Sequence, residues 1–559
     1  MNAAAPPATS TAAAPLDARA LEPWGVVSAP APRRGARQLG PVPLAVALSA
    51  LAALAYVIVS PPAADLAAAS YRADLFSRMG FTLWDNAWYG GHALVGYSLF
   101  SPALGAALGV NVLLALCTVL ASALFAAIAD RAFGRPAALA AAATFAVSLS
   151  GEMLSGRVPY TLGVALALAC VLALQRGHLA LALLAAPMTS LASPVAGAFL
   201  ALAGIALAIS ERQRSGLWVA ACALAPIGLL ALVFPEGGYE PFAASAFWPQ
   251  LAGVVVIALA LPRRWRTLRV GAALYAFALA AAYVIHTPVG SNAERLGALM
   301  AAPLLVGVLW GRRPLLLALV TPALLYWQLA TPVDDLAKVS GDPSLNASYY
   351  APLRAELERL TRGAPTRVEV PMTGAHSESA LVEGNGASAT GLMLARGWER
   401  QLDTLYAPLF YRARLGPVAY REWLHENAVS FVALPNVRLD ESALAEAALI
   451  RRGLPYLQEI WHSHDWRLFA VSGARPLATW PARLSALGSE SFTLAAPSAG
   501  TYEVRLRFSP YWALASGRGC VREAPGGWTA IEDRAPGAVR VQMAFSPARV
   551  FDHDARCRA

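Results

Sequence analysis

The chain has 559 residues, of which 57% are hydrophobic and only 14% are charged, and its formal net charge is +9. Soluble domains are about a quarter charged, so the composition excludes an ordinary soluble protein and places most of the first 330 residues in lipid. The arginines fall in short clusters between apolar runs, as membrane topology requires, and this excludes nucleic acid as the partner.

The N-terminal residues 1–38 are rich in Ala, Pro, Thr and Ser and end in a basic cluster. This composition cannot bury a core, so we expect a disordered cytoplasmic tail. The apolar run at 42–59 is longer than a signal-peptide core, and no small-residue cleavage site follows it. We therefore predict an uncleaved first transmembrane helix.

The predicted membrane part, 39–332, contains eleven apolar segments that are candidates for transmembrane helices. An alternative joins the two segments on either side of Ser193-Pro194 into one broken helix. The segments lie at about 41–60, 103–129, 137–150, 161–174, 179–191, 194–210, 217–234, 247–262, 270–286, 298–310 and 314–330.

The arginine distribution predicts the orientation of these segments. With a cytoplasmic N-terminus, nearly all loop arginines fall on the cytoplasmic side. We therefore expect a multi-pass plasma-membrane protein with an extracytoplasmic C-terminal part. The loop arginines of the other side are Arg72, Arg78, Arg157 and Arg295.

The large first outer loop, 61–102, contains the most unusual stretch of the membrane part. Residues 71–102 hold two aspartates, two arginines, two tryptophans, three tyrosines and a Gly-Gly pair. A membrane protein that gathers such residues in one loop is expected to perform recognition or chemistry there. The alternative is an amphipathic helix on the membrane surface, anchored by Trp and Tyr.

Arginines on the outer side oppose the topology signal, so Arg72, Arg157 and Arg295 each need a local partner. A carboxylate, a lipid headgroup or a substrate phosphate would serve. A structural pair of Arg72 with Asp74 or Glu152 is the simplest alternative.

After Pro332 the composition becomes that of a soluble protein. Helical and strand-like patterns alternate over 340–475, which predicts an extracytoplasmic α/β domain. Strand patterns alone fill 479–559, which predicts a small β-sandwich-like module. If this part is extracytoplasmic, Cys520 and Cys557 could form a disulfide that pins the tail.

Few catalytic or metal motifs are present. The stretch WHSHDW has His462, His464 and Asp465 at a spacing that can bind metal, but no third ligand can be named, and a polar edge strand is the favoured interpretation. The sequence has no P-loop, G-x-S-x-G, C-x-x-C or H-E-x-x-H motif.

The predicted chain begins with one helix and a large outer loop that has an early acid and a W-x-x-x-W-Y-G-G segment. About ten further helices and an outer C-terminal domain follow. This arrangement resembles the GT-C superfamily of membrane glycosyltransferases. LWDNAWYGGHALVGYSLFSP (83–102) and LSGRVPYTLG (154–163) also resemble bacterial membrane proteins labelled "6-pyruvoyl-tetrahydropterin synthase-related", some of them similar to YfhO-type proteins. That label does not predict pterin chemistry, because such a synthase needs a histidine metal cluster that is not visible here.

The resemblance implies a polytopic α-helical, GT-C-like membrane protein that transfers a sugar from a polyprenyl-phosphate donor to an extracytoplasmic acceptor, a cell-envelope glycan or glycolipid. Its acid, which accepts the acceptor proton or holds a metal, would lie in the first outer loop. Asp74 is the first candidate, Asp85 the second and Asp65 the third. No cofactor is certain, and a divalent metal is left open.

The resemblance also implies binding roles. Arg157 and Arg295, with Arg72, would contact the donor phosphate and substrate. The aromatic residues Trp84, Trp88 and Tyr89 would line an acceptor groove. The competing class is a non-catalytic polytopic protein: an envelope-assembly scaffold, a glycolipid-binding protein or a transporter. The scarcity of acids in the apolar segments counts against ion-coupled transport.

Overall fold

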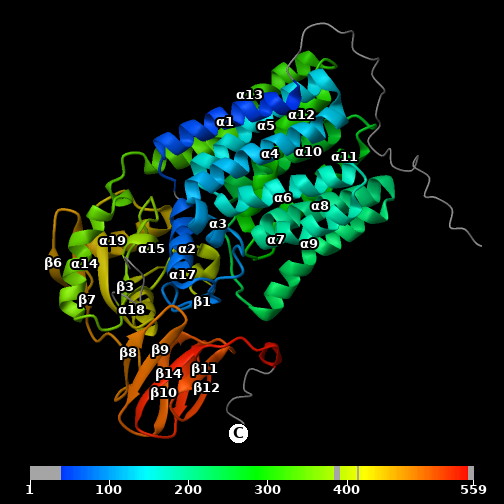
Figure 1. The fold of residues 1–559 in the computed structure, drawn as a ribbon. Helices are drawn as coiled ribbons and strands as arrows, with labels where there is room; N and C mark the ends of the chain where they lie inside the picture. Colours follow the sequence, from blue (N-terminus) through cyan, green and yellow to red (C-terminus); the bar gives the residue numbers. More distant parts are fainter. Residues whose placement is uncertain (1–39, 64, 383–390, 404, 412–414, 552–559) are drawn as a thin grey trace, which may run out of the picture.

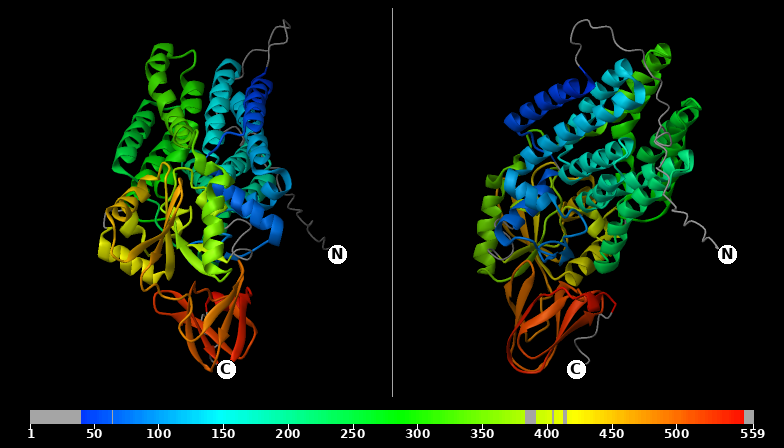
Figure 2. Two further views of the ribbon diagram at one scale, coloured as in Figure 1. Left: turned by 90° about the vertical axis from the view of Figure 1, so that its left-hand side faces the viewer. Right: turned by 45° about the vertical axis from the view of Figure 1, so that its right-hand side comes forward.

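The computed structural model describes residues 40–63, 65–382, 391–403, 405–411 and 415–551. The chain is a polytopic helical membrane protein with sheets in its C-terminal part (Figure 1). The two views of Figure 2 show the helical bundle at one end, the mixed sheet in the middle and the all-strand part at the other end. The tail predicted over 1–38 lies outside the described residues.

Within the described residues, nine helices are long and apolar enough to cross a membrane, and two shorter apolar helices, α7 and α10, bring the number to the predicted eleven. Each corresponds to one predicted segment. They are α1 (Pro41–Val59), α4 (Val110–Phe133), α5 (Arg135–Ser155), α6 (Val158–Gln175), α7 (Leu179–Ala192), α8 (Pro194–Glu211), α9 (Arg214–Val233), α10 (Ala244–Ala260), α11 (Arg266–Val284), α12 (Arg295–Leu309) and α13 (Pro314–Val339).

The segments around Ser193 form two separate helices rather than one broken helix. Ser193 is extended and its hydroxyl accepts a hydrogen bond from the Ala196 amide, which starts α8. Gly197 packs directly on Ser190, where a Cβ would lie only 2.7 Å from the Ser190 Cβ. The two helices therefore fold back on each other, and glycine allows the close approach.

The first outer loop forms α2 (Leu66–Met79), a hairpin of β1 (Trp84–Asp85) and β2 (His92–Ala93), and α3 (Ser101–Leu108). Tyr71, Leu75 and Trp88 from this loop share a hydrophobic core with residues of the mixed sheet such as Val368. The alternative of an interfacial helix on the membrane surface is therefore not what the structure shows, because the apolar side chains pack on protein.

A five-stranded sheet follows α13, with the order β4-β3-β5-β7-β6. Its first three strands are parallel, and β7 is antiparallel to both β5 and β6. The carboxyl ends of the parallel strands form one edge, which faces the first outer loop. The elements are α14 (Ala347–Thr361), β3 (Thr366–Glu369), α15 (Glu378–Leu381), β4 (Leu392–Leu394), α17 (Ala407–Tyr411), α18 (Pro417–Glu426), β5 (Val429–Pro435), α19 (Leu444–Arg452), β6 (Leu457–His462) and β7 (Trp466–Val471).

The last part is a pair of packed sheets, ordered β11-β14-β9-β8 and β10-β13-β12. Burial alternates along its strands, and Phe492, Trp512 and Ile531 lie in the core between the sheets. The strands are β8 (Arg483–Leu487), β9 (Ser491–Ala496), β10 (Gly500–Arg507), β11 (Trp512–Ser516), β12 (Gly519–Ala524), β13 (Trp528–Asp533) and β14 (Gly537–Met543).

The disulfide expected between Cys520 and Cys557 stays a prediction. Cys520 is buried on β12, whereas Cys557 lies outside the described residues.

Gly91 in the β1–β2 turn offers a direct test of the packing of the first outer loop. Its φ is +123°, and a Cβ there would lie 2.7 Å from Cζ2 of Trp84. We expect Gly91→Ala to destabilise the protein by about 1–3 kcal/mol through steric overlap and backbone strain. Gly96→Ala is the control, because no heavy atom lies within 4 Å of its Cβ position. Equal thermal unfolding midpoints of the two variants in one detergent would contradict this packing.

Candidate functional site

Arg72 pairs with a carboxylate, one of the partners expected from the sequence, but this carboxylate belongs to neither Asp74 nor Glu152. Its guanidinium donates to Glu399 from Nε (3.1 Å) and Nη2 (2.6 Å), and Nη1 donates to the Leu94 carbonyl oxygen (3.1 Å). The two side chains are 3% and 4% exposed. Arg72 therefore joins the first outer loop to the loop after β4, and this buried pair is structural.

Asp74 and Asp85, the first two acid candidates, lie away from the predicted phosphate arginines. Asp74 is exposed on α2 and pairs with Arg78 at 3.4 Å. Asp85 is fully buried and accepts hydrogen bonds from the Tyr71 hydroxyl (2.6 Å) and the Ala87 amide (3.2 Å). Burial raises the pKa of Asp85, although these hydrogen bonds oppose the shift. The structure therefore does not support the expected grouping of these acids with Arg157 and Arg295.

The three aromatic residues of the predicted acceptor groove are core residues instead. The indole of Trp88 donates to the Ser379 carbonyl (3.0 Å), and the Tyr89 hydroxyl donates to the Gly397 carbonyl (2.7 Å). Trp84 is 5% exposed and packs edge-on against Trp512. All three rings are therefore buried where the loop docks on the C-terminal part of the chain, against α15, the loop after β4 and β11.

Arg157 and Arg295, by contrast, meet at the end of the bundle where α13 leads into the mixed sheet. Arg157 contacts Asp65 (Nε–Oδ2, 3.2 Å), Glu152 (Nη1–Oε2, 3.2 Å) and Asp335 (Nη2–Oδ2, 3.7 Å). Arg295 Nη2 lies 3.8 Å from the same Asp65 oxygen. We call these five residues the junction cluster and this end of the bundle the domain-side end.

The junction cluster is assembled from five separate places in the sequence. Asp65 immediately precedes α2, Glu152 lies in the last turn of α5, Arg157 precedes α6, Arg295 begins α12 and Asp335 lies near the end of α13. Asp65, the third acid candidate, is therefore the one that bridges both predicted phosphate arginines. Its side chain keeps 22% exposure, so a ligand hydroxyl can approach it.

In the junction cluster, the guanidinium of Arg157 lies among three carboxylates. Although burial alone would lower it, the carboxylates of Glu152, Asp65 and Asp335 raise the pKa of Arg157 above its ordinary value. Arg295 has fewer acidic partners, and its guanidinium lies over the Tyr160 ring at 5.5 Å. Arg295 is thus the cation with more capacity left for an anionic ligand.

A second charged group lies opposite, at the carboxyl edge of the parallel strands. Arg400 and His376 both contact Asp440, at 2.8 and 3.1 Å, and His376 stacks on Trp398 at 3.5 Å. Although burial opposes the shift, His376 and Arg400 lower the pKa of Asp440. No sequence motif marks these residues; the signal that could have found them is their position directly after predicted strands of an α/β sheet.

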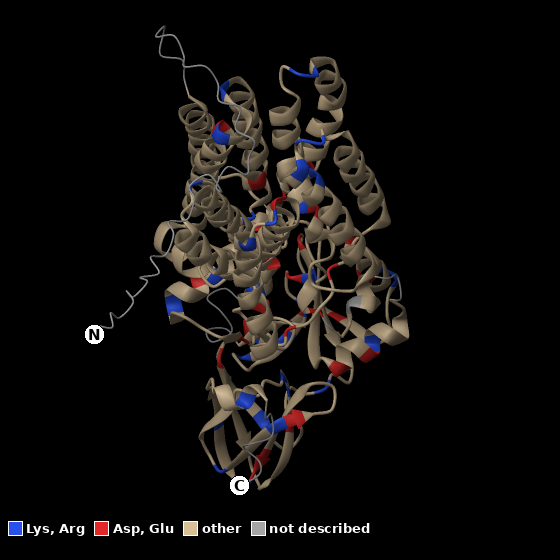
Figure 3. Cartoon of the chain, turned by 90° about the vertical axis from the view of Figure 1, so that its right-hand side faces the viewer, with Lys and Arg blue, Asp and Glu red and all other residues tan. Residues whose placement is uncertain are grey.

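Glu240, in the segment between α9 and α10, connects the two groups electrostatically. Burial raises its pKa, while Arg400 and Arg295 act on it in the opposite direction. One arginine of each group, the junction cluster and the sheet edge, thus lowers the pKa of Glu240. Figure 3 shows acidic and basic residues side by side where the bundle meets the sheets, and basic residues at the far end of the bundle.

The described residues offer no metal site. They contain no group of three or more His, Cys, Asp or Glu side chains arranged to hold a metal ion. His462 ends β6 and contacts Glu459, whereas His464 lies in the following turn and contacts Asp465, and both histidines are exposed. The divalent metal left open by the sequence therefore gains no ligand set here.

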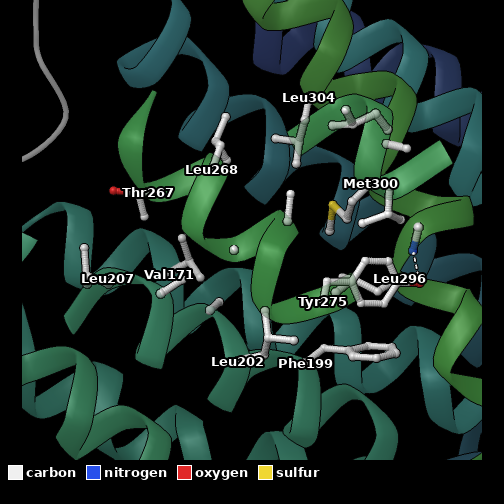
Figure 4. Close-up of a pocket in the computed structure, with 18 of the residues that line it drawn as sticks. Val171, Phe199, Leu202, Leu207, Thr267, Leu268, Tyr275, Leu296, Met300 and Leu304 are labelled. Atoms are coloured by element: carbon white, nitrogen blue, oxygen red, sulfur yellow. Dashed lines mark hydrogen bonds between the residues drawn. The ribbon is translucent and has the colours of Figure 1, made fainter. Parts of the chain in front are cut away.

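An apolar cavity of about 300 Å³ lies inside the bundle, between α6, α8, α10, α11, α12 and α13 (Figure 4). Its lining runs from Phe199, Tyr275 and Leu296, nearest the junction cluster, to Leu261 and Leu268 toward the other end. The sequence gives no signal for this cavity, because its lining residues are ordinary members of apolar helices.

Glu236, between α9 and α10, predicts a pH dependence of stability. Burial raises its pKa to about 7 from 4.5, against a hydrogen bond from the Ala93 amide. The folded state keeps the proton of Glu236 to a higher pH than the unfolded state does. The resulting contribution to folding stability is complete below pH 4.5 and is lost as the pH rises through about 7. At about 1.4 kcal/mol per unit, we expect a loss on the order of 3 kcal/mol.

Thermal unfolding across this pH range measures the effect of Glu236. Glu236→Gln keeps an oxygen for the Ala93 amide but cannot titrate, so its midpoint should vary less with pH than that of the wild type. Parallel curves for the two proteins would show that another group is responsible.

No family model matches the chain, and no curated protein matches it. Among solved structures, the chain is similar to arabinofuranosyltransferase AftD from Mycobacteria, with a TM-score of 0.43 and 17% sequence identity. The match covers 78% of this chain and 40% of that chain, so this chain spans less than half the length of that protein. A likeness at this level carries no conclusion about activity.

Proposed function

We propose that the protein is a GT-C-type membrane glycosyltransferase that moves a sugar from a polyprenyl-phosphate donor to an extracytoplasmic acceptor, an envelope glycan or glycolipid. The observation that carries the proposal is the position of Asp65 between Arg157 and Arg295 at the domain-side end of the bundle. An accessible carboxylate beside two guanidinium groups supplies a proton acceptor and cations for a leaving phosphate in one place.

In the proposed reaction, an acceptor hydroxyl attacks the anomeric carbon of the donor sugar and loses its proton to Asp65. The bond between that carbon and the phosphate oxygen breaks, and polyprenyl phosphate leaves with the bonding electrons. Arg295 stabilises the negative charge that develops on the phosphate, and Arg157 holds Asp65 in position. Asp65 thus takes the role that the sequence analysis gave first to Asp74 and Asp85.

The orientation belongs to the same proposal. The basic end of the bundle would face the cytoplasm, according to the positive-inside rule. The junction cluster and both C-terminal sheet parts would then lie on the outer side of the plasma membrane. Donor and acceptor would meet between the bundle and the carboxyl edge of the mixed sheet.

A second candidate is a non-catalytic protein, either an envelope-assembly scaffold or a glycolipid-binding protein. The observation that favours it is the composition of the junction cluster, in which three carboxylates surround two arginines and all take part in ion pairs. Such a network also serves to hold helix ends together, without any turnover.

Complementation of a gene deletion separates the two candidates. Loss of the gene should remove or shorten an envelope glycan, and the wild-type gene should restore it. Asp74→Asn, which alters an exposed acid on α2, should restore it equally, whereas Asp65→Asn should not. Restoration by Asp65→Asn at normal protein level would exclude the enzymatic role of Asp65 and favour the scaffold.

A further inference from the structure

The apolar cavity has the character of a site for a hydrocarbon chain. Its lining is almost wholly aliphatic and aromatic. The hydroxyls of Thr267 and Tyr275 are bonded elsewhere, to Glu211 (3.0 Å) and to the Ala293 carbonyl (2.7 Å). Water therefore finds few partners in this cavity, whereas an apolar chain from the surrounding lipid suits it.

Aromatic rings separate this cavity from the junction cluster. Phe199 packs perpendicular to Tyr275 and to Tyr160, with ring centroids 6.4 Å apart in each pair. Arg295 lies over the Tyr160 ring, on the side of the junction cluster. A chain inside the cavity would therefore have to pass these rings to place its headgroup at Arg295, so its headgroup belongs at the opposite end.

That opposite end carries a rim of arginines. Leu261, Thr267 and Leu268 line the cavity. The exposed residues Arg263, Arg264 and Arg266 lie between the first two of these positions in the sequence. The neighbouring helix ends add further exposed arginines. The acidic residue that lies next to them is Glu211. The further arginines are Arg176, Arg212, Arg214, Arg312 and Arg313.

Cations from two of these loops crowd one another. Burial and the like charge of Arg264 lower the pKa of Arg312. Like charges that face each other at a membrane surface are relieved by an anionic headgroup, and each such residue adds about a fivefold factor to anionic-lipid binding.

We propose that the cavity and its arginine rim bind an anionic glycerophospholipid from the leaflet at this end of the bundle. One acyl chain would occupy the cavity, and the phosphate would contact Arg263 and Arg264. The site is independent of the proposed sugar transfer. Positively charged cytoplasmic loops also set membrane topology, so the arginines alone do not indicate a lipid site. What indicates the site is that the arginine rim lies beside a cavity large enough for an acyl chain.

The test uses the full-length protein reconstituted in vesicles of equal parts phosphatidylglycerol and phosphatidylcholine. The vesicles also contain a small amount of a polyprenyl-phosphate sugar. After extraction in detergent, mass spectrometry measures the phosphatidylglycerol and the polyprenyl-phosphate sugar retained per protein. The double variant Arg263→Gln/Arg264→Gln should bind phosphatidylglycerol about 30-fold more weakly. The matched control Arg131→Gln/Arg135→Gln removes two charges from the same end of the bundle, one in the last turn of α4 and one at the start of α5, and should retain it.

A cavity-filling variant tests the acyl chain separately. At Gly271, a Cβ would meet Ala206 at an ordinary 3.7 Å, so Gly271→Leu should fill the cavity and expel the lipid with all arginines intact. Ala301→Leu, from another lining helix, serves if Gly271→Leu does not fold.

Three outcomes would overturn the proposal. Equal lipid loss in the control double variant would mean that the arginines attract anionic lipid without a site. Unchanged retention in a folded cavity-filling variant would remove the chain from the cavity. Loss of a polyprenyl-phosphate donor, with phosphatidylglycerol retained, would assign the cavity to the donor. None of these readouts needs transferase activity, so a failure of the proposed function is seen separately.

Discussion

Asp65→Asn is expected to lower the rate of sugar transfer by about a hundredfold to ten-thousandfold while donor binding changes little. This is the usual contribution of a general base, and the amide cannot accept the proton of the acceptor hydroxyl. The variant should fold, because an amide oxygen can still accept the hydrogen bond that Arg157 Nε donates to Asp65. The loss should therefore lie in kcat rather than in protein yield.

Single-turnover assays with purified protein and a radiolabelled polyprenyl-phosphate sugar measure this rate. Asp74→Asn is the matched control, since it removes the same charge from the exposed face of α2, where Asp74 pairs only locally with Arg78. If Asp74→Asn and Asp65→Asn transfer equally well, the junction cluster is not the catalytic site. If both lose activity, the loss reflects the charge of the first outer loop rather than a base.

Arg72→Met is expected to cause the largest loss of stability, about 3–5 kcal/mol. The substitution leaves the Glu399 carboxylate buried without its cation, and such unpaired buried charges are strongly destabilising. The Leu94 carbonyl loses a hydrogen bond as well. Because the pair joins the first outer loop to the loop after β4, the variant should also expose the mixed sheet to proteases.

A double-mutant cycle isolates the contribution of this pair. Arg72→Met combined with Glu399→Met should recover much of the loss, because no charge is then left unpaired in the interior. Arg78→Met is the control on the same helix, where an exposed pair contributes about 0–1 kcal/mol. Thermal unfolding and limited proteolysis in detergent measure five proteins: the wild type, Arg72→Met, Glu399→Met, the double variant and Arg78→Met. No recovery in the double variant would mean that Arg72 acts through packing rather than through charge.

The residues of the first outer loop that these predictions concern differ in burial and fall into two classes. Arg72, Asp85 and Trp88 are buried and hold the loop on the C-terminal sheets. Asp65 lies at the start of the loop and is partly exposed. It contacts Arg157 and Arg295, which come much later in the sequence. Asp65 can therefore meet a substrate without local unfolding, whereas the buried residues cannot.

The membrane helices follow from the sequence because their cause is local. A run of about twenty apolar residues satisfies its backbone only as a helix in lipid, so hydropathy alone locates each span. All eleven predicted segments contain a helix, and even the short ones, α7 and α10, are correctly placed. The strands after residue 479 follow for a similar reason, since alternating apolar residues bury one face of each strand.

The candidate site did not follow from the sequence, because its contacts join distant residues. Arg72 and Glu399 are 327 positions apart, so the sequence offered only the nearer acids Asp74 and Glu152 as partners. A concentration of aromatic and charged residues in one loop looks the same in sequence whether it lines a groove or docks a domain. Burial distinguishes the two, and burial depends on what packs against the loop.

The sequence by itself thus determined the positions of the apolar helices, the basic end of the bundle and the presence of Arg157 and Arg295 at the other end, because hydropathy and charge act residue by residue. Only the tertiary structure decided which acid meets those arginines, since Asp65 reaches them across three helix ends. It also decided that the aromatic loop is a packed interface and that a cavity lies within the bundle, because both depend on how side chains from separate helices and sheets fill the space between them.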